Sequence, residues 1–541
     1  MQYYDRAISK RIKNALKISP VVFINGPRQA GKSTLVREIA TEYPGMGYVT
    51  FDDITTRANA SSDPQGFLRG FLNPVIIDEV QKVPEIFEGL KLLVDEHRLK
   101  DKTSANGRFL LTGSVDAMAF PKLSESLVGR MIPISLYPLS ASEIFSGGNP
   151  VISGLFDQRI VFSQKNEDKQ PTLSEAITKA SFPEITEMSK DGRHEWFSGY
   201  INTIFERDVR ELAQIEKITA LPGILKVLAA SVGSLLKDSD LAKSTNLNPM
   251  TCKRYKVLFE KLFLIKQVSP WYRSVGHSAV KAHKTFFIDT PLLCHQLGVD
   301  LEELKKNDPN LFGHILENFV FSELQKQLSL NIGSDLYFFR THDNKEVDFI
   351  IERKDGALIG IEVKSSDSVD NRYFHNLSKL KDKIGEKFVR GIVLYCGKNT
   401  MCFANDMVAM PIDSLWNLNM NIEFEEIGTD NEGDKVIIWA KYGDNTHIRC
   451  DIERNVISDY FYNNPASREE MINVVKSHSD VVEPIFIRKI MEGLVHNRVD
   501  PELIDELKYD HGDNCIGSRY QTVLRTRLLP GDFDYRDFRK K

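Results

Sequence analysis

The sequence predicts an α/β chain of several domains, organised around a parallel sheet. A glycine-rich loop near residue 30 stands between an apolar run and a helical pattern, and apolar runs then alternate with helical patterns as far as residue 150. A second group of apolar runs near residue 360 carries carboxylates and a lysine. Because 541 residues exceed what one hydrophobic core organises, we expect separate domains.

Composition is that of an ordinary globular protein. The chain is 42% hydrophobic and 27% charged. Its formal net charge of -5 argues against a protein surface that is basic overall and binds nucleic acid, but it does not exclude a local basic groove. The 6 cysteines are scattered without metal-site spacing, as in reduced cytoplasmic proteins. No apolar run is long enough to span a membrane, and the N-terminus has no apolar signal core. We therefore expect a cytoplasmic location and no membrane partner.

The glycine-rich loop has the spacing GxxxxGK[ST] between a strand and a helix. It comprises Gly26, Pro27, Arg28, Gln29, Ala30, Gly31, Lys32, Ser33 and Thr34. In such a phosphate-binding loop (P-loop), glycines allow successive N–H groups to point at one anion, and the helix N-terminus adds positive potential. We expect Lys32 to reach the β- and γ-phosphates of an adenine nucleotide and Ser33 to bind Mg²⁺. The alternative, a chance glycine turn, leaves the flanking strand and helix unexplained.

Polar residues end the next strands. One apolar run ends in Asp78 and Glu79, and a later run ends near Ser114. Because the carboxyl ends of parallel strands share one edge of the sheet, we expect Asp78 to hold Mg²⁺, Glu79 to polarise the attacking water and Ser114 to touch the γ-phosphate or the water. A plain acidic turn is the alternative. Arg130 is the arginine we expect to neutralise transition-state charge, in cis or on a neighbouring subunit of a homo-oligomer; a surface salt bridge is its alternative.

Four segments together carry a resemblance: GPRQAGKST, VIIDEVQKVPEIF, FLLTGS and SLVGRMIPISLYPLSASEI. In this order they resemble a prokaryotic AAA+-like ATPase family whose members carry a C-terminal domain of unknown function, DUF4143. The resemblance continues through residues 181–184 and 200–209 and ends near residue 416. It implies an AAA+-like ATPase at residues 1–150, with ATP and Mg²⁺ as cofactors.

The middle of the chain reads as helical. Residues 151–215 are predicted to form a helical connector or lid, in which Arg207 and Asp208 either approach the nucleotide or pair with each other. Residues 216–297 read as a winged helix-turn-helix, whose second helix carries Lys253, Arg254, Lys256 and Lys261. Such a helix can enter the major groove of DNA, but the fold also serves as a plain protein-contact module.

Residues 298–420 form the second candidate for chemistry. Glu317 lies on a predicted helix and Asp348 on the next strand but one, while Glu362 and Lys364 are two apart and so share a strand face. This arrangement resembles the PD-(D/E)XK nuclease superfamily. The resemblance implies that Glu317, Asp348 and Glu362 hold one or two Mg²⁺ ions and that Lys364 activates water for attack on a phosphodiester. The alternatives are a solvent-facing strand with paired charges, or a nuclease-like fold kept only for binding.

Residues 421–541 read as an α+β accessory domain. We expect strands at 422–424, 435–440 and 448–452 and helices near 456–461, 468–476 and 482–497. This part shows no chemistry and reads as a module for a protein partner. As a whole, the sequence predicts an ATPase coupled to a nuclease-like, nucleic-acid-associated domain, in defence or DNA processing. The alternatives are an ATP-dependent switch with an inactive nuclease-like fold and a DNA-binding regulator.

Overall fold

The computed structural model describes residues 3–100, 105–114, 127–145, 151–156, 171–212, 218–272, 283–330, 333–341, 345–404, 406–417, 422–430, 433–442, 446–460, 467–479, 482 and 522–528. The chain divides into two compact units. One comprises Met1–Ile152 with Lys169–Asn417, and the other comprises Ser153–Asp168 with Leu418–Lys541.

The first sheet of the larger unit is parallel throughout. In chain order its strands are β1 (Val21–Asn25), β2 (Gly47–Thr50), β3 (Val75–Asp78), β4 (Phe109–Gly113) and β5 (Met131–Ser135), and their spatial order is β2-β3-β4-β1-β5. Every residue of β1, β3 and β4 is buried, which explains the nearly continuous apolar runs. The prediction of a parallel sheet with the glycine-rich loop at its carboxyl edge is confirmed.

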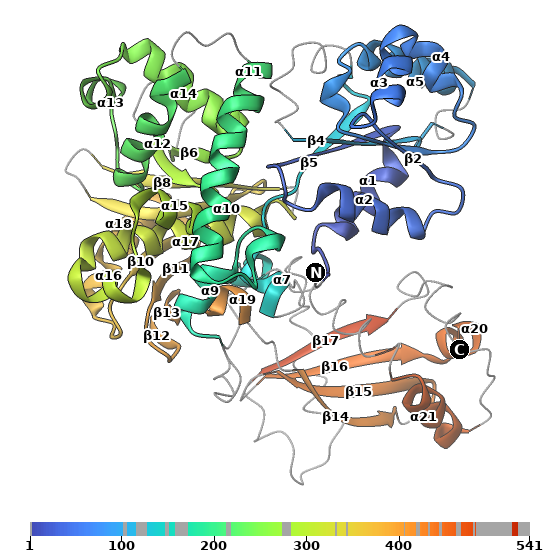
Figure 1. Ribbon diagram of the computed structural model, residues 1–541. Helices are drawn as coiled ribbons and strands as arrows, with labels where there is room; N and C mark the ends of the chain where they lie inside the picture. Colours follow the sequence, from blue (N-terminus) through green and yellow to red (C-terminus); the bar gives the residue numbers. More distant parts are fainter. Residues whose placement is uncertain are drawn as a thin grey trace. The chain divides into compact units, whose positions relative to one another are not determined.

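Helices cover both faces of this sheet (Figure 1). They are α1 (Ser9–Ile18), α2 (Lys32–Thr41), α3 (Ile54–Ser62), α4 (Pro64–Arg69) and α5 (Ile86–Lys100), with a 3₁₀ turn η1 (Val80–Lys82) after β3. Successive residues of β1 serve opposite cores, as the two-residue period of a strand requires. Val22 and Ile24 pack with α1 and α2, whereas Val21 and Phe23 pack with α5.

Short helices follow the sheet. They are α7 (Ala141–Phe145), α8 (Ile152–Leu155), α9 (Leu173–Lys179), η4 (Pro183–Ile185), α10 (Lys190–Thr203), η5 (Ile204–Asp208) and α11 (Val209–Leu212). Helix α10 begins at Lys190, and the Ser189 hydroxyl caps it by accepting from the Gly192 N–H at 3.2 Å. Directly after α10, η5 forms one π-helical turn, a form often found at functional sites.

The second sheet has eight strands in the order β12-β13-β11-β10-β9-β8-β6-β7. Their bounds are β6 (Ile265–Pro270), β7 (Lys284–Phe287), β8 (Ser334–Arg340), β9 (Glu346–Arg353), β10 (Leu358–Lys364), β11 (Phe388–Tyr395), β12 (Met401–Ala404) and β13 (Met407–Pro411). The hairpin β6–β7, expected as a separate wing, joins this sheet because Ser269 and Pro270 of β6 pair in parallel with Tyr337 and Phe338 of β8.

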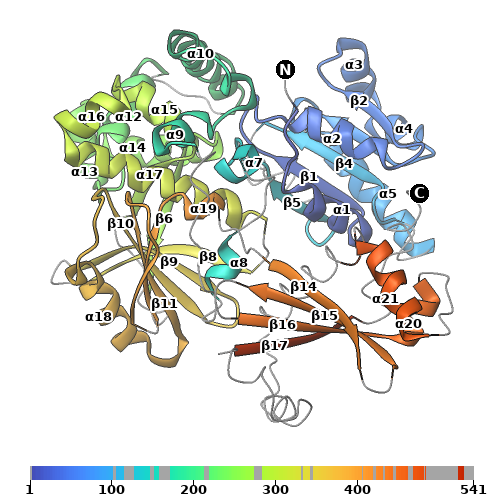
Figure 2. The same cartoon turned by 90° about the horizontal axis from the view of Figure 1, so that it is seen from below.

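The helices of this half of the unit are η6 (Ile218–Ala220), α12 (Leu221–Ala230), α13 (Asp238–Thr245), α14 (Pro249–Lys261), α15 (Thr290–Leu297), α16 (Leu301–Asn307), α17 (Pro309–Leu328), η8 (Asn371–Phe374), α18 (His375–Ile384), η9 (Gly385–Lys387) and α19 (Ser414–Asn417). The sheet lies between α17 and α18 (Figure 2). Phe349 of β9 contacts Phe321 of α17, whereas Gly360, which pairs with the next residue of β9, lies against Leu377 of α18.

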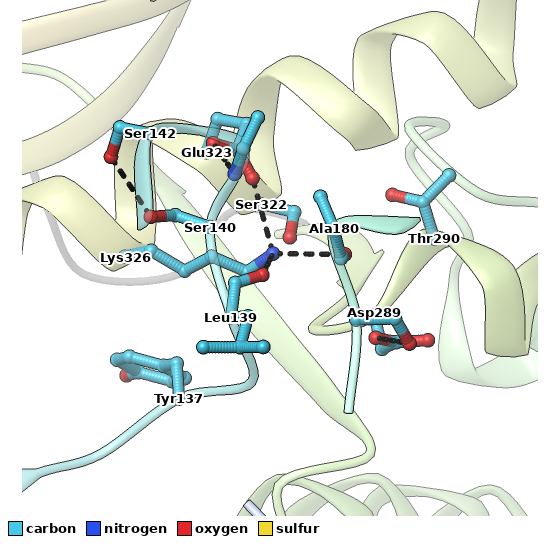
Figure 3. Close-up of polar contacts among 12 residues, drawn as sticks. Tyr137, Leu139, Ser140, Ser142, Ala180, Asp289, Thr290, Ser322, Glu323 and Lys326 are labelled. Carbon is cyan, nitrogen blue, oxygen red and sulfur yellow. Dashed lines mark hydrogen bonds and ion pairs between the residues drawn. The ribbon is translucent and has the colours of Figure 1, made fainter. Parts of the chain in front are cut away.

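Buried charged side chains of α17 hold the segment that leaves the first sheet (Figure 3). The Lys326 ammonium donates to the carbonyl oxygens of Leu139 and Ala180 at 2.9 and 3.2 Å and to Glu323 at 3.1 Å. Glu323 in turn accepts from the Ala141 N–H at 2.9 Å. The ATPase-like sheet and the second sheet therefore belong to one compact unit.

The smaller unit contains a four-stranded sheet, β14-β15-β16-β17. Its elements are β14 (Ile422–Thr429), β15 (Lys435–Tyr442), β16 (Thr446–Glu453), α20 (Arg454–Tyr460), α21 (Arg468–Ser477) and β17 (Thr522–Leu528). The first three strands include the three expected segments and pair antiparallel in chain order, and β17, which was not predicted, adds in parallel to β16. Almost all of the helix expected at 482–497 lies outside the described residues. Among the described residues, no helix has the length and apolarity needed to cross a bilayer.

Candidate nucleotide-binding site and acidic cluster

The P-loop connects β1 to α2 at the carboxyl edge of the first sheet. Gly26 has φ 153°, and a Cβ there would lie 2.1 Å from the Leu136 carbonyl oxygen, so no other residue fits without backbone movement. Gly31, at φ 90°, caps α2 in the left-handed conformation. The glycine positions of the motif thus match the backbone that the loop adopts.

Lys32 lies inside the loop. Its Nζ donates to the carbonyl oxygens of Gly26 and Pro27 at 2.9 and 2.8 Å. Burial lowers the pKa of Lys32 to about 8, although the negative charges of Glu79 and Asp78 oppose the shift. The ammonium group is therefore desolvated and already next to the strand-end carboxylates.

Asp78 ends β3 and is fixed by two hydroxyl groups. Its carboxylate accepts from the Tyr48 hydroxyl at 2.7 Å and from the Thr112 hydroxyl. Asp78 and Ser33 line the same cavity, of about 490 Å³. The structure thus places together the two side chains that the sequence assigned to Mg²⁺.

Glu79 follows with a left-handed backbone at φ 56°. Strain of this kind is concentrated at functional sites, and the Glu79 N–H is held by the Thr112 hydroxyl oxygen at 3.2 Å. The Gln81 amide donates both to the Glu79 carboxylate and to the Ser114 hydroxyl, the latter at 3.0 Å. Gln81, which the sequence reading missed, therefore links two predicted catalytic residues.

A larger cavity, of about 1040 Å³, lies between the P-loop and α10. Its P-loop wall is formed by Arg28, Gln29, Gly31, Lys32, Ser33 and Thr34, with Glu79 beside them. The facing wall includes Trp196 and Tyr200, whose rings stack with centroids 5.0 Å apart and planes 10° from parallel. Burial raises the pKa of Tyr200 well above its usual value, so its side chain stays uncharged.

Arg28 of the P-loop forms an ion pair with Asp208 of the π-helical turn. The guanidinium contacts both carboxylate oxygens at 2.6 Å, and Asp208 is buried. The sequence predicted that Asp208 approaches the nucleotide or pairs with Arg207, and neither alternative includes Arg28. The connector is thereby attached to the phosphate-binding loop itself.

Arg130 lies at the amino-terminal edge of the parallel sheet, opposite the edge that carries the P-loop. It directly precedes Met131, which pairs with Val21 at the start of β1, whereas the P-loop follows the end of β1. A strand of that length separates the two ends by ~16 Å. The Nε and Nη2 groups of its guanidinium donate to the two carboxylate oxygens of Asp95, at 2.6 and 2.9 Å. This geometry favours the alternative, a salt bridge, over a role on the nucleotide of its own chain, and action on a neighbouring subunit stays a prediction.

The second group of predicted residues forms a buried acidic cluster, which also contains a cation that the sequence reading missed. Lys284 of β7 has its Nζ 2.8 Å from Glu317, 2.5 Å from Glu346 and 3.9 Å from Asp348. The predicted Lys364 pairs with Glu362 of its own strand at 2.6 Å. One oxygen of Asp348 accepts from the Val363 N–H at 2.8 Å.

The carboxylates do not fit the metal role expected of them. No group of three or more acidic, histidine or cysteine side chains in the described part of the chain is arranged to hold a metal ion. The Lys284 ammonium lies among Glu317, Glu346 and Asp348. Burial, followed by the charge of Asp348, raises the pKa of Glu317 to about 8 and that of Glu362 to about 8. Burial lowers the pKa of Lys284, but the neighbouring carboxylates reverse the shift and keep it charged.

The predicted recognition helix, α14, exposes fewer basic side chains than its composition suggests. Lys253 and Arg254 are exposed. Lys256 is buried and pairs with Asp238 at 2.5 Å, so it faces the protein and not a partner.

Three stretches of the chain match described protein families. Residues 19–145 match a family described as "AAA domain", residues 170–303 match a domain of unknown function, DUF8612, and residues 312–415 match a domain of unknown function, DUF4143. An uncharacterized protein of Mycobacterium tuberculosis is 28% identical over 413 residues, covering 76% of this chain and 84% of its own length. An uncharacterized protein of Haemophilus influenzae is 24% identical over 396 residues, covering 68% of this chain and 88% of its own.

Among solved structures, the Walker-type ATPase of Pyrococcus abyssi aligns with 14% identity and a TM-score of 0.34, over 55% of this chain and 96% of its own. Cdc6p of Pyrobaculum aerophilum aligns with 14% identity and a TM-score of 0.20, over 48% of this chain and 85% of its own. Scores this low do not establish a common overall structure. The assignment depends on the sequence matches: an AAA domain, which indicates an ATP-binding ATPase, is followed by DUF4143. The chain thus carries an AAA domain followed by a DUF4143 domain, the combination of the AAA+-like ATPase family that its sequence resembles.

Proposed function

We propose that the protein binds ATP with Mg²⁺ between the P-loop and α10 and hydrolyses its terminal phosphoanhydride bond. One observation carries this proposal: Lys32, Ser33 and Glu79 line a single cavity of about 1040 Å³ at the carboxyl edge of the parallel sheet. A cavity of this size accommodates a nucleotide. The residue types and their positions match the needs of phosphoryl transfer to water.

Each side chain then has a distinct role. The loop N–H groups and the Lys32 ammonium bind the phosphates, and Ser33 and Asp78 would hold Mg²⁺, which neutralises charge on the phosphate oxygens. Glu79 polarises the attacking water. Gln81 orients Glu79 and Ser114 together, because it donates to both. The stacked pair Trp196 and Tyr200 offers a flat apolar wall for the adenine base.

Calorimetry with ATP and Mg²⁺, followed by a phosphate-release assay, tests this assignment. We expect Lys32→Ala to weaken ATP binding at least tenfold and Glu79→Gln to retain binding while hydrolysis falls about a hundredfold. Glu184→Gln is the matched control, because Glu184 lines the same cavity from η4, and it should leave turnover unchanged. Normal turnover in Glu79→Gln would show that another group activates the water.

A second candidate role concerns the nuclease-like half. The arrangement of Lys284 among the carboxylates favours an ATP-dependent switch or DNA-binding regulator, with an inactive nuclease-like fold, over a metal-dependent nuclease. The exposed Lys253 and Arg254 on α14 are the side chains we propose to contact DNA. Mg²⁺-dependent nicking of plasmid that is lost in Lys364→Ala would favour the nuclease. Footprinting that persists in Lys364→Ala but weakens in Lys253→Ala would favour the regulator.

A further inference from the structure

We propose that Lys284 is the built-in cation of the acidic cluster, so that the DUF4143 domain of this chain holds a lysine ammonium where a nuclease-like site would hold a divalent metal ion. The cluster consists of Glu317, Glu346, Asp348 and Glu362. This inference is independent of the nucleotide site, because none of these residues lines the cavity at the P-loop.

The distances suit an ammonium group. The Nζ of Lys284 lies 2.8 Å from Glu317 and 2.5 Å from Glu346, with Asp348 at 3.9 Å, and the side chain is 2% exposed. These are charge-assisted N–H···O distances, whereas Mg²⁺ requires oxygens at ~2.1 Å in near-octahedral order. One oxygen each of Glu317 and Glu346 is already bound to the lysine, and two cations cannot occupy one position.

The fold fixes Lys284 in this position through its neighbours on β7 and α17. Phe286, two residues along β7, stacks on Phe321 with centroids 4.6 Å apart and planes 13° from parallel. Phe321 is four residues along α17 from Glu317. Two residues of strand span ~6.7 Å and four residues of helix span ~6 Å, so the aromatic pair and the ion pair align side by side.

Asn318 adds a second constraint on the register of β7. Its side chain accepts from the Phe287 N–H at 2.7 Å and donates to the Phe287 carbonyl oxygen at 3.2 Å. β7 is the last strand of its sheet, and Asn318 therefore supplies hydrogen bonds that a further strand would otherwise make. A one-residue slip of β7 would turn Lys284 to the other face, and these contacts oppose it.

The remaining carboxylates of the cluster each have a partner, but one oxygen of Glu362, Oε1, is buried without a hydrogen-bond partner. Glu362 pairs with Lys364 at 2.6 Å, and Asp348 accepts the Val363 N–H at 2.8 Å. Gly233 at φ 71° brings backbone close to Glu317, and a Cβ there would lie 3.0 Å from its carboxylate. Lys284 thus joins the hairpin β6–β7 to α17 and β9 through ion pairs.

Removal of the lysine tests the proposal. Lys284→Met keeps the length of the side chain and removes its charge, leaving Glu317, Glu346 and Asp348 around an apolar group. We expect this variant to bind Mn²⁺ at least tenfold more tightly than the wild-type chain, in electron paramagnetic resonance titrations without nucleotide, and to gain thermal stability when Mn²⁺ is added. Glu317→Gln introduced into Lys284→Met should abolish the gain.

Lys364→Met is the matched control, because it removes the same charge from the same cluster but leaves Lys284 in place; it should gain no Mn²⁺ site. A folded Lys284→Met that binds Mn²⁺ no better than wild type would overturn the proposal. If Lys284→Met does not fold, Mn²⁺ titration of the wild-type protein still tests the proposal. Saturable Mn²⁺ binding that is lost in Glu317→Gln would overturn the proposal, and the absence of such binding would support it.

Discussion

The buried pair Lys326–Glu323 makes a quantitative prediction about the junction in Figure 3. Lys326→Met removes the donor from the Leu139 and Ala180 carbonyl oxygens and from Glu323, which is 0% exposed. A charge left buried without its partner costs about 3–5 kcal/mol of unfolding free energy. The single substitution should therefore remove a large fraction of the stability of this unit.

A double-mutant cycle separates the charge from the hydrogen bonds. Glu323→Gln keeps an oxygen that can accept the Ala141 N–H but removes the charge, so in the double variant no ion is left unpaired. Only the two carbonyl oxygens released by Lys326→Met remain unsatisfied. We expect the combined loss to be smaller than the sum of the single losses by about 2 kcal/mol.

Urea unfolding followed by circular dichroism measures each variant. Lys243→Met, in which the lysine is 82% exposed, controls for loss of a lysine and should change the free energy of unfolding by less than about 0.5 kcal/mol. Additive single effects, or a loss in Lys326→Met no greater than that of Lys243→Met, would refute the view that a buried charge pair fastens the ATPase sheet to α17.

Three further predictions concern single side chains. Asp208→Asn should tighten ATP binding about fivefold by calorimetry, because it removes a negative charge that contacts Arg28 of the P-loop; unchanged affinity would count against that coupling. Arg130→Ala should leave ATP turnover in dilute protein within about twofold, since Asp95 holds Arg130 away from the P-loop; a loss seen only at high protein concentration would instead indicate action on a neighbouring subunit. Burial raises the pKa of Asp289 to about 6 from 3.8, so the folded state binds more protons between these pH values and stability falls as pH rises through that window. Asp289→Asn should abolish this loss, which amounts to about 2 kcal/mol of unfolding free energy between pH 4 and pH 7; an unchanged pH profile would show that Asp289 does not titrate there.

The sequence predicted those parts of the nucleotide site that depend on local patterns. The P-loop, the strand ending in Asp78 and Glu79, and the strand ending near Ser114 are each contiguous segments. Parallel strands bring their carboxyl ends to one edge, so topology alone places these segments together. The same rule could have corrected Arg130, because that residue precedes its strand and therefore belongs to the opposite edge.

Ion pairs between residues far apart in the chain leave no comparable local pattern in the sequence. Gln81 could have been suspected only from its place two residues after Glu79, and Glu346 only from its two-residue spacing to Asp348, which puts both on one face of β9. Nothing near Lys284 in the chain marks it as the partner of Glu317, 33 residues later. That contact exists because β6–β7 joins the second sheet and Phe286 stacks on Phe321, which are outcomes of tertiary packing.

The case of Lys284 shows why a motif match and a site can differ. The pattern of Glu317, Asp348, Glu362 and Lys364 specifies which carboxylates converge, and they do converge. It does not specify the net charge of the space between them, which depends on every element that packs there. Lys284 from an adjoining hairpin supplies positive charge to these carboxylates beside Lys364 and Arg340, because a buried negative cluster requires compensating cations but not a particular one. The function of a DUF4143 domain in a given chain must therefore be judged from the charge that faces its carboxylates, in addition to the carboxylates themselves.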